Sequence, residues 1–213
     1  MVGVIEKHRS ITFGLSTGLE YSPGLYASET ELDTLAKHVP LVMSHMRNED
    51  DSELLASIEE LARQGKHTRV HIAHIKSVYG KGVGRAEEIL QYLDSLRDDG
   101  INISADVYPY TASYTGISIL FPEWSKTREQ FEQVKVNRRQ ELLDFLKNKI
   151  EKRNGPEATL FGSAPYAGKT LKQLSDERNL SPEAFLVDSI GPDGASAAYF
   201  VMDEALQERF IRD

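Results

Sequence analysis

The stretches Pro40-Leu-Val-Met-Ser-His45-Met-Arg47 and Thr68-Arg-Val-His-Ile-Ala-His74-Ile-Lys76 decide the predicted fold. Each is a short apolar run that follows a helix-like segment and closes on a histidine. In barrels of parallel strands joined by helices, functional side chains gather where the strands end. The repeated pattern therefore predicts two neighbouring parallel strands whose terminal histidines lie close together.

A third run, Ile-Asn-Ile-Ser-Ala-Asp106-Val-Tyr108-Pro-Tyr110, ends the next predicted strand in the same manner. Neutral imidazoles from neighbouring strands suit Zn²⁺ or a similar borderline ion, and a catalytic ion takes about three protein ligands and keeps an open position. We therefore predict His45 and His74 as metal ligands, with at least one further ligand from elsewhere. Asp106 either orients an imidazole or makes buried structural hydrogen bonds, and the sequence leaves both readings open.

Outward from these strands, helix-like segments alternate with strand-like ones. Apolar periodicity and boundary residues predict a strand over residues 11–16, a helix from Ser28 to about His38, a helix from about Ser52 to Gln64 that Gly65 ends, and a helix from Arg85 to about Asp98 that Gly100 ends. The last of these helices has one apolar stripe, formed by Ala86, Ile89, Leu90, Leu93 and Leu96. Such βαβ repetition predicts an α/β fold with a parallel sheet and helices packed outside it.

The alternation stops after Tyr110. The segment from Lys126 to Asn154 is strongly charged and helical in pattern, and further helices are expected near 170–179, 182–190 and 203–212. A run of about a hundred residues without a buried parallel strand is long for one connection. We therefore expect residues 1–120 to form part of a barrel and residues 121–213 to form an inserted, mostly helical subdomain.

Composition limits the partners. The chain has 213 residues, 40% hydrophobic and 27% charged, with a net charge of -8 and no cysteine. An acidic chain without a basic face argues against nucleic acid and anionic membrane surfaces, which leaves a small-molecule partner. No apolar run is long enough to span a membrane, and the absence of cysteine is compatible with the expected cytoplasmic location.

Five strings in order carry a family resemblance. They are Gly14-Leu-Ser-Thr-Gly-Leu-Glu-Tyr21-Ser-Pro-Gly24, Ser44-His45-Met-Arg47-Asn-Glu49, Ala73-His74-Ile-Lys76, Ala105-Asp106-Val-Tyr108-Pro-Tyr110-Thr-Ala112-Ser113, and Gly168-Lys-Thr-Leu171 with Ser181-Pro182 and Ala184. Together they cover nearly the whole chain and resemble the D-aminoacylase, or N-acyl-D-amino-acid deacylase, branch of the amidohydrolase superfamily.

The resemblance implies part of a TIM-type (β/α)₈ metal-dependent hydrolase barrel, about strands 4 to 7. His45 and His74 would hold one tightly bound Zn²⁺, and a second, weaker ion is left open. The family's His-x-His pair, cysteine ligand and catalytic aspartate have no counterpart here, and the aspartate is expected beyond Asp213. No catalytic residue is therefore assigned, and we expect an internal or truncated portion that is inactive and aggregation-prone in isolation.

The implied activity is removal of the N-acyl group from an N-acyl-D-amino acid by metal-activated water. Alternation places Lys76 on the same face as His74, where its ammonium could hold the substrate carboxylate. Tyr108 and Ser113 are candidate hydrogen-bond donors to substrate, and Arg47 could pair with Glu49 or with substrate. The alternatives are a dihydroorotase-like or hydantoinase-like cyclic-amide hydrolase, which the lack of a lysine in residues 15–18 disfavours, and a non-catalytic truncated barrel.

The remaining histidines have ordinary explanations. His71, three residues before His74, is expected on the opposite face and packed under a helix. His8, His38 and His67 fall at helix ends or in loops, where solvation is expected. The glycines of residues 80–84 suggest a mobile loop, because they lack the pattern of a phosphate-binding loop.

Overall fold

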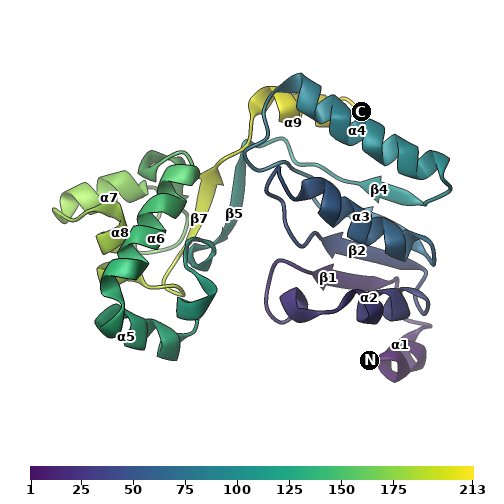
Figure 1. Ribbon diagram of the computed structural model, residues 1–213, viewed down its shortest axis with the longest axis horizontal. Coiled ribbons are helices and arrows are strands. Elements are labelled where there is room, and N and C mark those ends of the chain that lie inside the picture. The colour runs from purple at the N-terminus through teal and green to yellow at the C-terminus, as the bar shows by residue number, and fades with distance from the viewer. The chain divides into compact units, whose positions relative to one another are not determined.

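The computed structural model describes residues 1–213, which form two units (Figure 1). Unit 1 comprises Met1–Tyr110 and Met202–Asp213, and unit 2 comprises Thr111–Val201. The expected boundary near residue 120 differs from this division at both ends of unit 2. The strand that begins at Ala112 is paired within unit 2, and the final helix packs against unit 1.

Unit 1 is built on a four-stranded parallel sheet in the order β1-β2-β3-β4. The strands are β1 (Leu15–Gly18), β2 (Leu41–His45), β3 (Arg69–Ile72) and β4 (Ile103–Ala105). Its helices are α1 (Val2–His8), α2 (Glu29–Ala36), α3 (Leu54–Gly65), α4 (Gly82–Asp98) and α9 (Glu204–Ile211), with a short 3₁₀ turn η1 (Gly24–Tyr26). The sheet of parallel strands joined by helices is the arrangement that the alternating sequence predicts.

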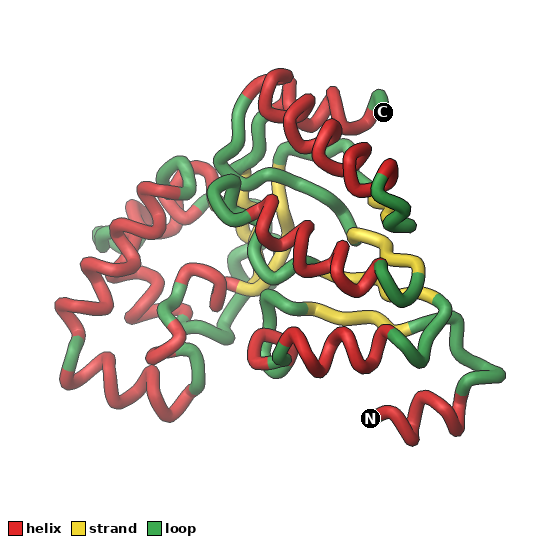
Figure 2. The backbone as a smooth tube through the Cα atoms, turned by 45° about the vertical axis from the view of Figure 1, so that its right-hand side comes forward, coloured by secondary structure: helices red, strands yellow, loops and turns green.

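The helices α2, α3 and α4 cover one face of this sheet (Figure 2). Val42, Val70 and Ile103 form a register row on that face, and all three are buried in the core. The predicted apolar stripe of α4 is buried against them, at Ala86, Ile89, Leu90, Leu93 and Leu96. The next register row carries Met43, His71 and Ser104, and its side chains stand on the face without helices.

Boundary residues confirm some expectations and correct others. The Ser28 hydroxyl accepts from the Glu31 backbone N–H and begins α2, and Gly100 follows α4 with a positive φ of 83°. Gly65, by contrast, is the last residue of α3 and not a left-handed cap. A Cβ at Gly65 would lie 2.6 Å from the Ile101 side chain, so close packing explains this glycine.

The predicted first strand begins later than expected. Only Leu15 and Ser16 of residues 11–16 belong to β1, which continues to Gly18. Ile11 and Phe13 are 76% and 94% exposed, so the apolar pattern here does not reflect burial in the sheet.

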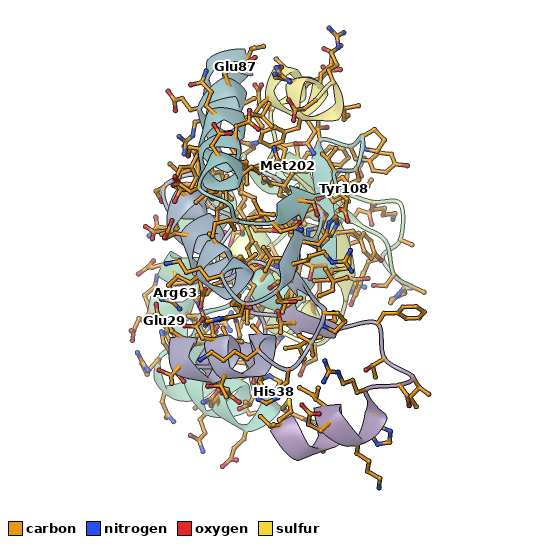
Figure 3. All side chains as sticks on the ribbon, turned by 90° about the vertical axis from the view of Figure 1, so that its right-hand side faces the viewer. Glu29, His38, Arg63, Glu87, Tyr108 and Met202 are labelled. Carbon is orange, nitrogen blue, oxygen red and sulfur yellow. The ribbon has the colours of Figure 1, made fainter.

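The chain returns to unit 1 through α9, which packs against α4 (Figure 3). Arg209 of α9 donates to Glu87 of α4 over 2.5 Å. Asp203 joins the same two helices, because its Oδ1 accepts from the backbone N–H groups of Leu206 and Gly82, each at 3.0 Å. The predicted last helix is therefore confirmed, as a member of the first unit.

Unit 2 contains an antiparallel sheet in the order β5-β7-β6, with strands β5 (Ala112–Gly116), β6 (Thr159–Phe161) and β7 (Ser196–Phe200). Its helices are α5 (Arg128–Asn137), α6 (Arg139–Lys152), α7 (Leu171–Glu177), α8 (Pro182–Phe185), the π-helix η5 (Leu186–Ile190), and the 3₁₀ turns η2 (Ile117–Leu120), η3 (Glu123–Ser125) and η4 (Pro156–Ala158). The expectation of a mostly helical insertion therefore missed a sheet. None of the helices in either unit combines the length and apolarity that crossing a bilayer requires.

Candidate metal site

Two loops of unit 1 continue the parallel pairing of β2 and β3 beyond the ends of those strands. Asp50 and Val78 form a parallel bridge, in which Asp51 N–H donates to the Val78 carbonyl and Val78 N–H donates to the Glu49 carbonyl, both at 2.8 Å. This pairing holds residues 46–51 beside residues 73–78. Side chains that follow the two strands therefore meet at the carboxyl edge of the sheet.

Three of these side chains form a candidate metal site. One ligand atom from each of His45, Glu49 and His74 lies within 4.8 Å of the others. The two imidazole rings are 4.7 Å apart between centroids and 77° apart in plane. Two imidazoles and a carboxylate are the donor types of catalytic zinc sites, which keep a fourth position for water or substrate. The residues present thus fit a zinc-like ion.

The backbone carbonyl of the next residue, Met46, fixes the tautomer of His45. Its Nδ1 donates to the Met46 carbonyl over 2.9 Å, which leaves the lone pair on Nε2. Burial lowers the pKa of His45 and outweighs the opposing attraction of Glu49. A neutral imidazole with its lone pair on Nε2 is the form that binds a metal ion.

Glu49 is a member of this site that the sequence analysis did not identify. It is buried, with 6% of its surface exposed, and its Oε1 lies 3.4 Å from His74 Nδ1 and 3.8 Å from His45 Nε2. Burial alone would raise the pKa of Glu49, but contacts with His74 and Lys76 bring it below its ordinary value. The site therefore contains a buried carboxylate that is charged at neutral pH.

Lys76 neutralises that carboxylate. Its ammonium, 3% exposed, donates to Glu49 Oε1 over 2.5 Å and lies 2.8 Å from Nδ1 of His74. Burial lowers the pKa of Lys76, against the attraction of Glu49. Strand alternation predicts that Lys76 and His74 face the same way, and the structure brings them together, although both residues lie beyond β3.

Tyr108 borders the same cluster. Its ring is 6.2 Å from the ring of His74, and the Lys76 ammonium lies 5.6 Å from its centroid. Burial, together with the charge of Glu49, raises the pKa of Tyr108 well above its usual range. Its hydroxyl therefore stays protonated and can donate a hydrogen bond.

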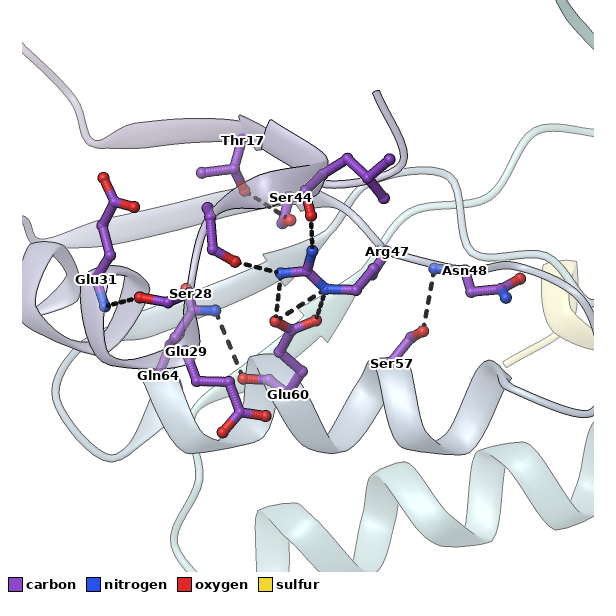
Figure 4. Close-up of polar contacts among 12 residues, drawn as sticks. Thr17, Ser28, Glu29, Glu31, Ser44, Arg47, Asn48, Ser57, Glu60 and Gln64 are labelled. Carbon is purple, nitrogen blue, oxygen red and sulfur yellow. Dashed lines mark hydrogen bonds and ion pairs between the residues drawn. The ribbon is translucent and has the colours of Figure 1, made fainter. Parts of the chain in front are cut away.

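Arg47 does not pair with Glu49, which is one of the two partners that the sequence analysis considered. Its guanidinium donates to Glu60 of α3, with the shortest contact at 2.7 Å, and to the carbonyls of Leu25 and Ala27 (Figure 4). Alternation no longer governs side chains past the end of β2. Arg47 ties α3 to the loop after β1, and this geometry does not support the expected substrate contact.

Ser113, the last of the predicted substrate-binding residues, belongs to the other unit. It lies on β5 opposite Tyr199 of β7. The histidine cluster is carried by unit 1 alone.

His71 corrects a further expectation. It does not pack under a helix but stands on the uncovered face, with Nδ1 2.8 Å from the Ser104 hydroxyl and Nε2 2.9 Å from Asp106 Oδ2. The other oxygen of Asp106 accepts from the backbone N–H of His74 over 2.5 Å. Burial would raise the pKa of Asp106, but the hydrogen bonds from His71 and His74 hold it below its usual value.

The other histidines lie away from this cluster. His8 and His67 are exposed, as expected, and His38 Nδ1 lies 2.8 Å from Glu6. Gly82 and Gly84, expected in a mobile loop, are instead in the first turn of α4.

The chain resembles known proteins in sequence and in fold. No family model matches the chain. An N-acyl-D-glutamate deacylase of Alcaligenes xylosoxydans xylosoxydans is 36% identical over 116 residues, which is 52% of this chain and 23% of that protein.

Among solved structures, the N-acyl-D-glutamate deacylase of Bordetella bronchiseptica, complexed with zinc and a phosphonate inhibitor, matches 95% of this chain with a TM-score of 0.69 and 24% identity. A D-aminoacylase matches 99% of the chain with a TM-score of 0.67 and 23% identity. The chain spans 37% and 40% of these two proteins. The structural matches show a shared fold, and the sequence match agrees with the predicted resemblance: over 116 residues, this chain is similar to an N-acyl-D-glutamate deacylase.

Proposed function

We propose that this chain supplies the metal-binding edge of an N-acyl-D-amino-acid deacylase, a hydrolase that converts an N-acyl-D-amino acid to a D-amino acid and a carboxylate. The observation that carries the proposal is the convergence of His45, Glu49 and His74 at the ends of two adjacent parallel strands. The partial match to an N-acyl-D-glutamate deacylase supports the same activity.

The barrel assignment is part of this proposal. Four parallel strands with helices on one face form an arc of the kind found in (β/α)₈ barrels, and we assign β1 to β4 to about strands 4 to 7. The polar row on the uncovered face would then line the barrel interior. Unit 2 would be an insertion between barrel elements.

We assign one zinc ion to the cluster, held by His45, His74 and Glu49. When bound, zinc polarises an amide carbonyl and makes water acidic enough to attack it at neutral pH. The chain's own residues would position the substrate. Tyr108 can donate to the substrate carboxylate or to the oxygen that gains charge, and no residue of this chain is assigned as the general base.

Lys76 would recognise the carboxylate of the amino-acid substrate. In the structure its ammonium contacts Glu49 and His74, two of the three residues that would hold the ion. A substrate carboxylate would offer the Lys76 ammonium a further partner of opposite charge.

Metal titration of variants tests the proposal. His45→Ala and His74→Ala should each weaken zinc binding by about two orders of magnitude or more, measured calorimetrically after chelation, because each removes a ligand. His67→Ala, which changes an exposed histidine of the same unit, serves as the control and should bind normally. Normal zinc binding by both ligand variants would contradict the assignment.

A substrate comparison in the full-length protein tests the reaction. N-acetyl-D-glutamate should be hydrolysed in preference to its L-isomer and to dihydroorotate or a hydantoin. Preference for a cyclic amide would instead favour the dihydroorotase-like alternative. Zinc binding without hydrolysis of any of these compounds would favour a non-catalytic protein.

A further inference from the structure

We infer that Asp106, held by His71, is a positioning residue that fixes the orientation of the metal ligand His74; this inference rests on the proposed function. The two residues belong to neighbouring strands or their ends, with His71 on β3 and Asp106 directly after β4. The Asp106 carboxylate contacts the backbone N–H of His74, so the proposed action runs through the conformation of His74.

His74 has a backbone conformation that needs support. Its φ is +45°, in the left-handed region, which is uncommon for a residue with a side chain. This conformation turns the chain after β3 and brings the imidazole to within 4.7 Å of the His45 ring. An extended backbone at this position would send the imidazole in a different direction.

Asp106 makes three hydrogen bonds to this turn. Its Oδ1 accepts from the His74 N–H over 2.5 Å, its carbonyl accepts from the Ile75 N–H over 2.7 Å, and its own N–H donates to the Ile72 carbonyl over 3.1 Å. The two backbone bonds continue the pairing of β3 with β4. Of the three hydrogen bonds, the one that the Asp106 carboxylate accepts is made by His74 itself, the residue with the positive φ.

The carboxylate is held in place from its other side. His71 Nε2 lies 2.9 Å from Asp106 Oδ2, and the Ser104 hydroxyl lies 2.8 Å from His71 Nδ1. Since Asp106 has half of its side chain exposed, water would otherwise compete for its oxygens and allow other rotamers. Hydrogen bonds thus connect the side chains of Ser104, His71 and Asp106 in series, and the last of them contacts the backbone of the proposed metal ligand His74.

Groups outside the first coordination shell commonly change metal affinity by about 10-fold to 100-fold when removed. We expect Asp106→Ala to weaken zinc binding within that range. Asp106→Asn keeps an oxygen that can accept from His74 and should restore affinity to within about threefold of wild type. Asp94→Ala removes an exposed carboxylate from α4 and is the matched control.

Two readouts separate positioning from general destabilisation. At saturating Co²⁺ the ligand-field spectrum should differ between Asp106→Ala and wild type, because the direction of one imidazole has changed, whereas a purely structural role would leave the spectrum of the loaded protein unchanged. Circular dichroism and thermal unfolding report folding in parallel. If Asp106→Ala does not fold, the same two measurements on His71→Phe test the inference. This variant removes the His71 contact to the Asp106 carboxylate but leaves the hydrogen bond from the His74 N–H possible.

Each outcome bears on the inference separately from the proposed function. If His74→Ala loses zinc while both Asp106→Ala and His71→Phe bind it normally with unchanged Co²⁺ spectra, Asp106 has no positioning role and the metal site stands. If His45→Ala and His74→Ala bind zinc normally, the proposed function fails first. Loss of affinity in Asp106→Ala with rescue by Asp106→Asn supports the inference.

Discussion

The two units of the chain differ in where they place their polar groups. All six histidines lie in residues 1–110, and unit 1 buries Glu49, Glu60 and Lys76. In unit 2 the buried charged side chain is Arg153, whose guanidinium lies 4.8 Å from the centroid of the Tyr199 ring, and many ion pairs lie at the surface, such as Lys172–Asp176 and Arg139–Asp188. Buried charge is costly unless it is paired, so the buried Glu49 and Lys76 beside two histidines indicate a site and not a folding requirement.

The largest expected effect is on the free energy of unfolding, and it is tested by replacing one lysine in each unit. Lys76→Met should lower the free energy of unfolding of the metal-free protein by about 3–5 kcal/mol, because it leaves the Glu49 carboxylate buried without its partner. Lys172→Met, which breaks an exposed pair of α7, should change it by less than about 1 kcal/mol. Urea unfolding with a chelator present measures both. Equal effects would show that burial does not distinguish the two pairs.

A core substitution in unit 2 tests whether the stability of that unit affects the metal site of unit 1. Phe161 is 1% exposed, so Phe161→Ala should destabilise unit 2 by about 3–5 kcal/mol through loss of burial and creation of a cavity. Zinc affinity should stay within about threefold of wild type, because every candidate ligand belongs to unit 1. Loss of zinc binding together with the unit 2 transition would show that the units are energetically coupled.

The smallest expected effect concerns the return of the chain to unit 1. Asp203→Ala should cost about 0.5–2 kcal/mol, since it removes the acceptor that caps α9. Hydrogen bonds from the backbone of Leu206 and then Gly82 lower the pKa of Asp203 below its ordinary value, so its contribution is present at neutral pH and is lost as the pH falls through the folded-state pKa. Unfolding free energies of wild type and variant should therefore converge in acid. A difference that grows on acidification would contradict this account.

The sequence predicted the parts of the site that depend on strand periodicity. His45 and His74 could be paired because each closes an apolar run after a helix, and the structure brings their rings together. Glu49 could not be found in this way, since its position depends on two loops that keep their parallel pairing past the strands. Arg47 was misplaced for the same reason, because alternation does not extend into that loop.

The antiparallel sheet of unit 2 escaped prediction on different physical grounds. Its strands are three to five residues long and pair segments that are distant in the sequence, such as Ala112 with Phe200. Short strands of this kind lack a distinctive pattern, and non-local pairing decides their conformation. The capped helices of the same unit, with Thr127 and Thr170 as N-caps, carry local signals and were placed well.

The pairing of Ala112 with Phe200 also has a thermodynamic consequence for unit 1. Chain segments that pair in a ladder lie about 5 Å apart, so the segment that leaves unit 1 and the one that returns to it are neighbours. Once unit 2 has folded, the ends of this long connection are already held together. The entropic cost that unit 1 pays for closing the connection is then about that of a short hairpin. As long as β5 and β7 stay paired, the residues between these two strands can therefore change in length and sequence without loosening the sheet that presents the histidines.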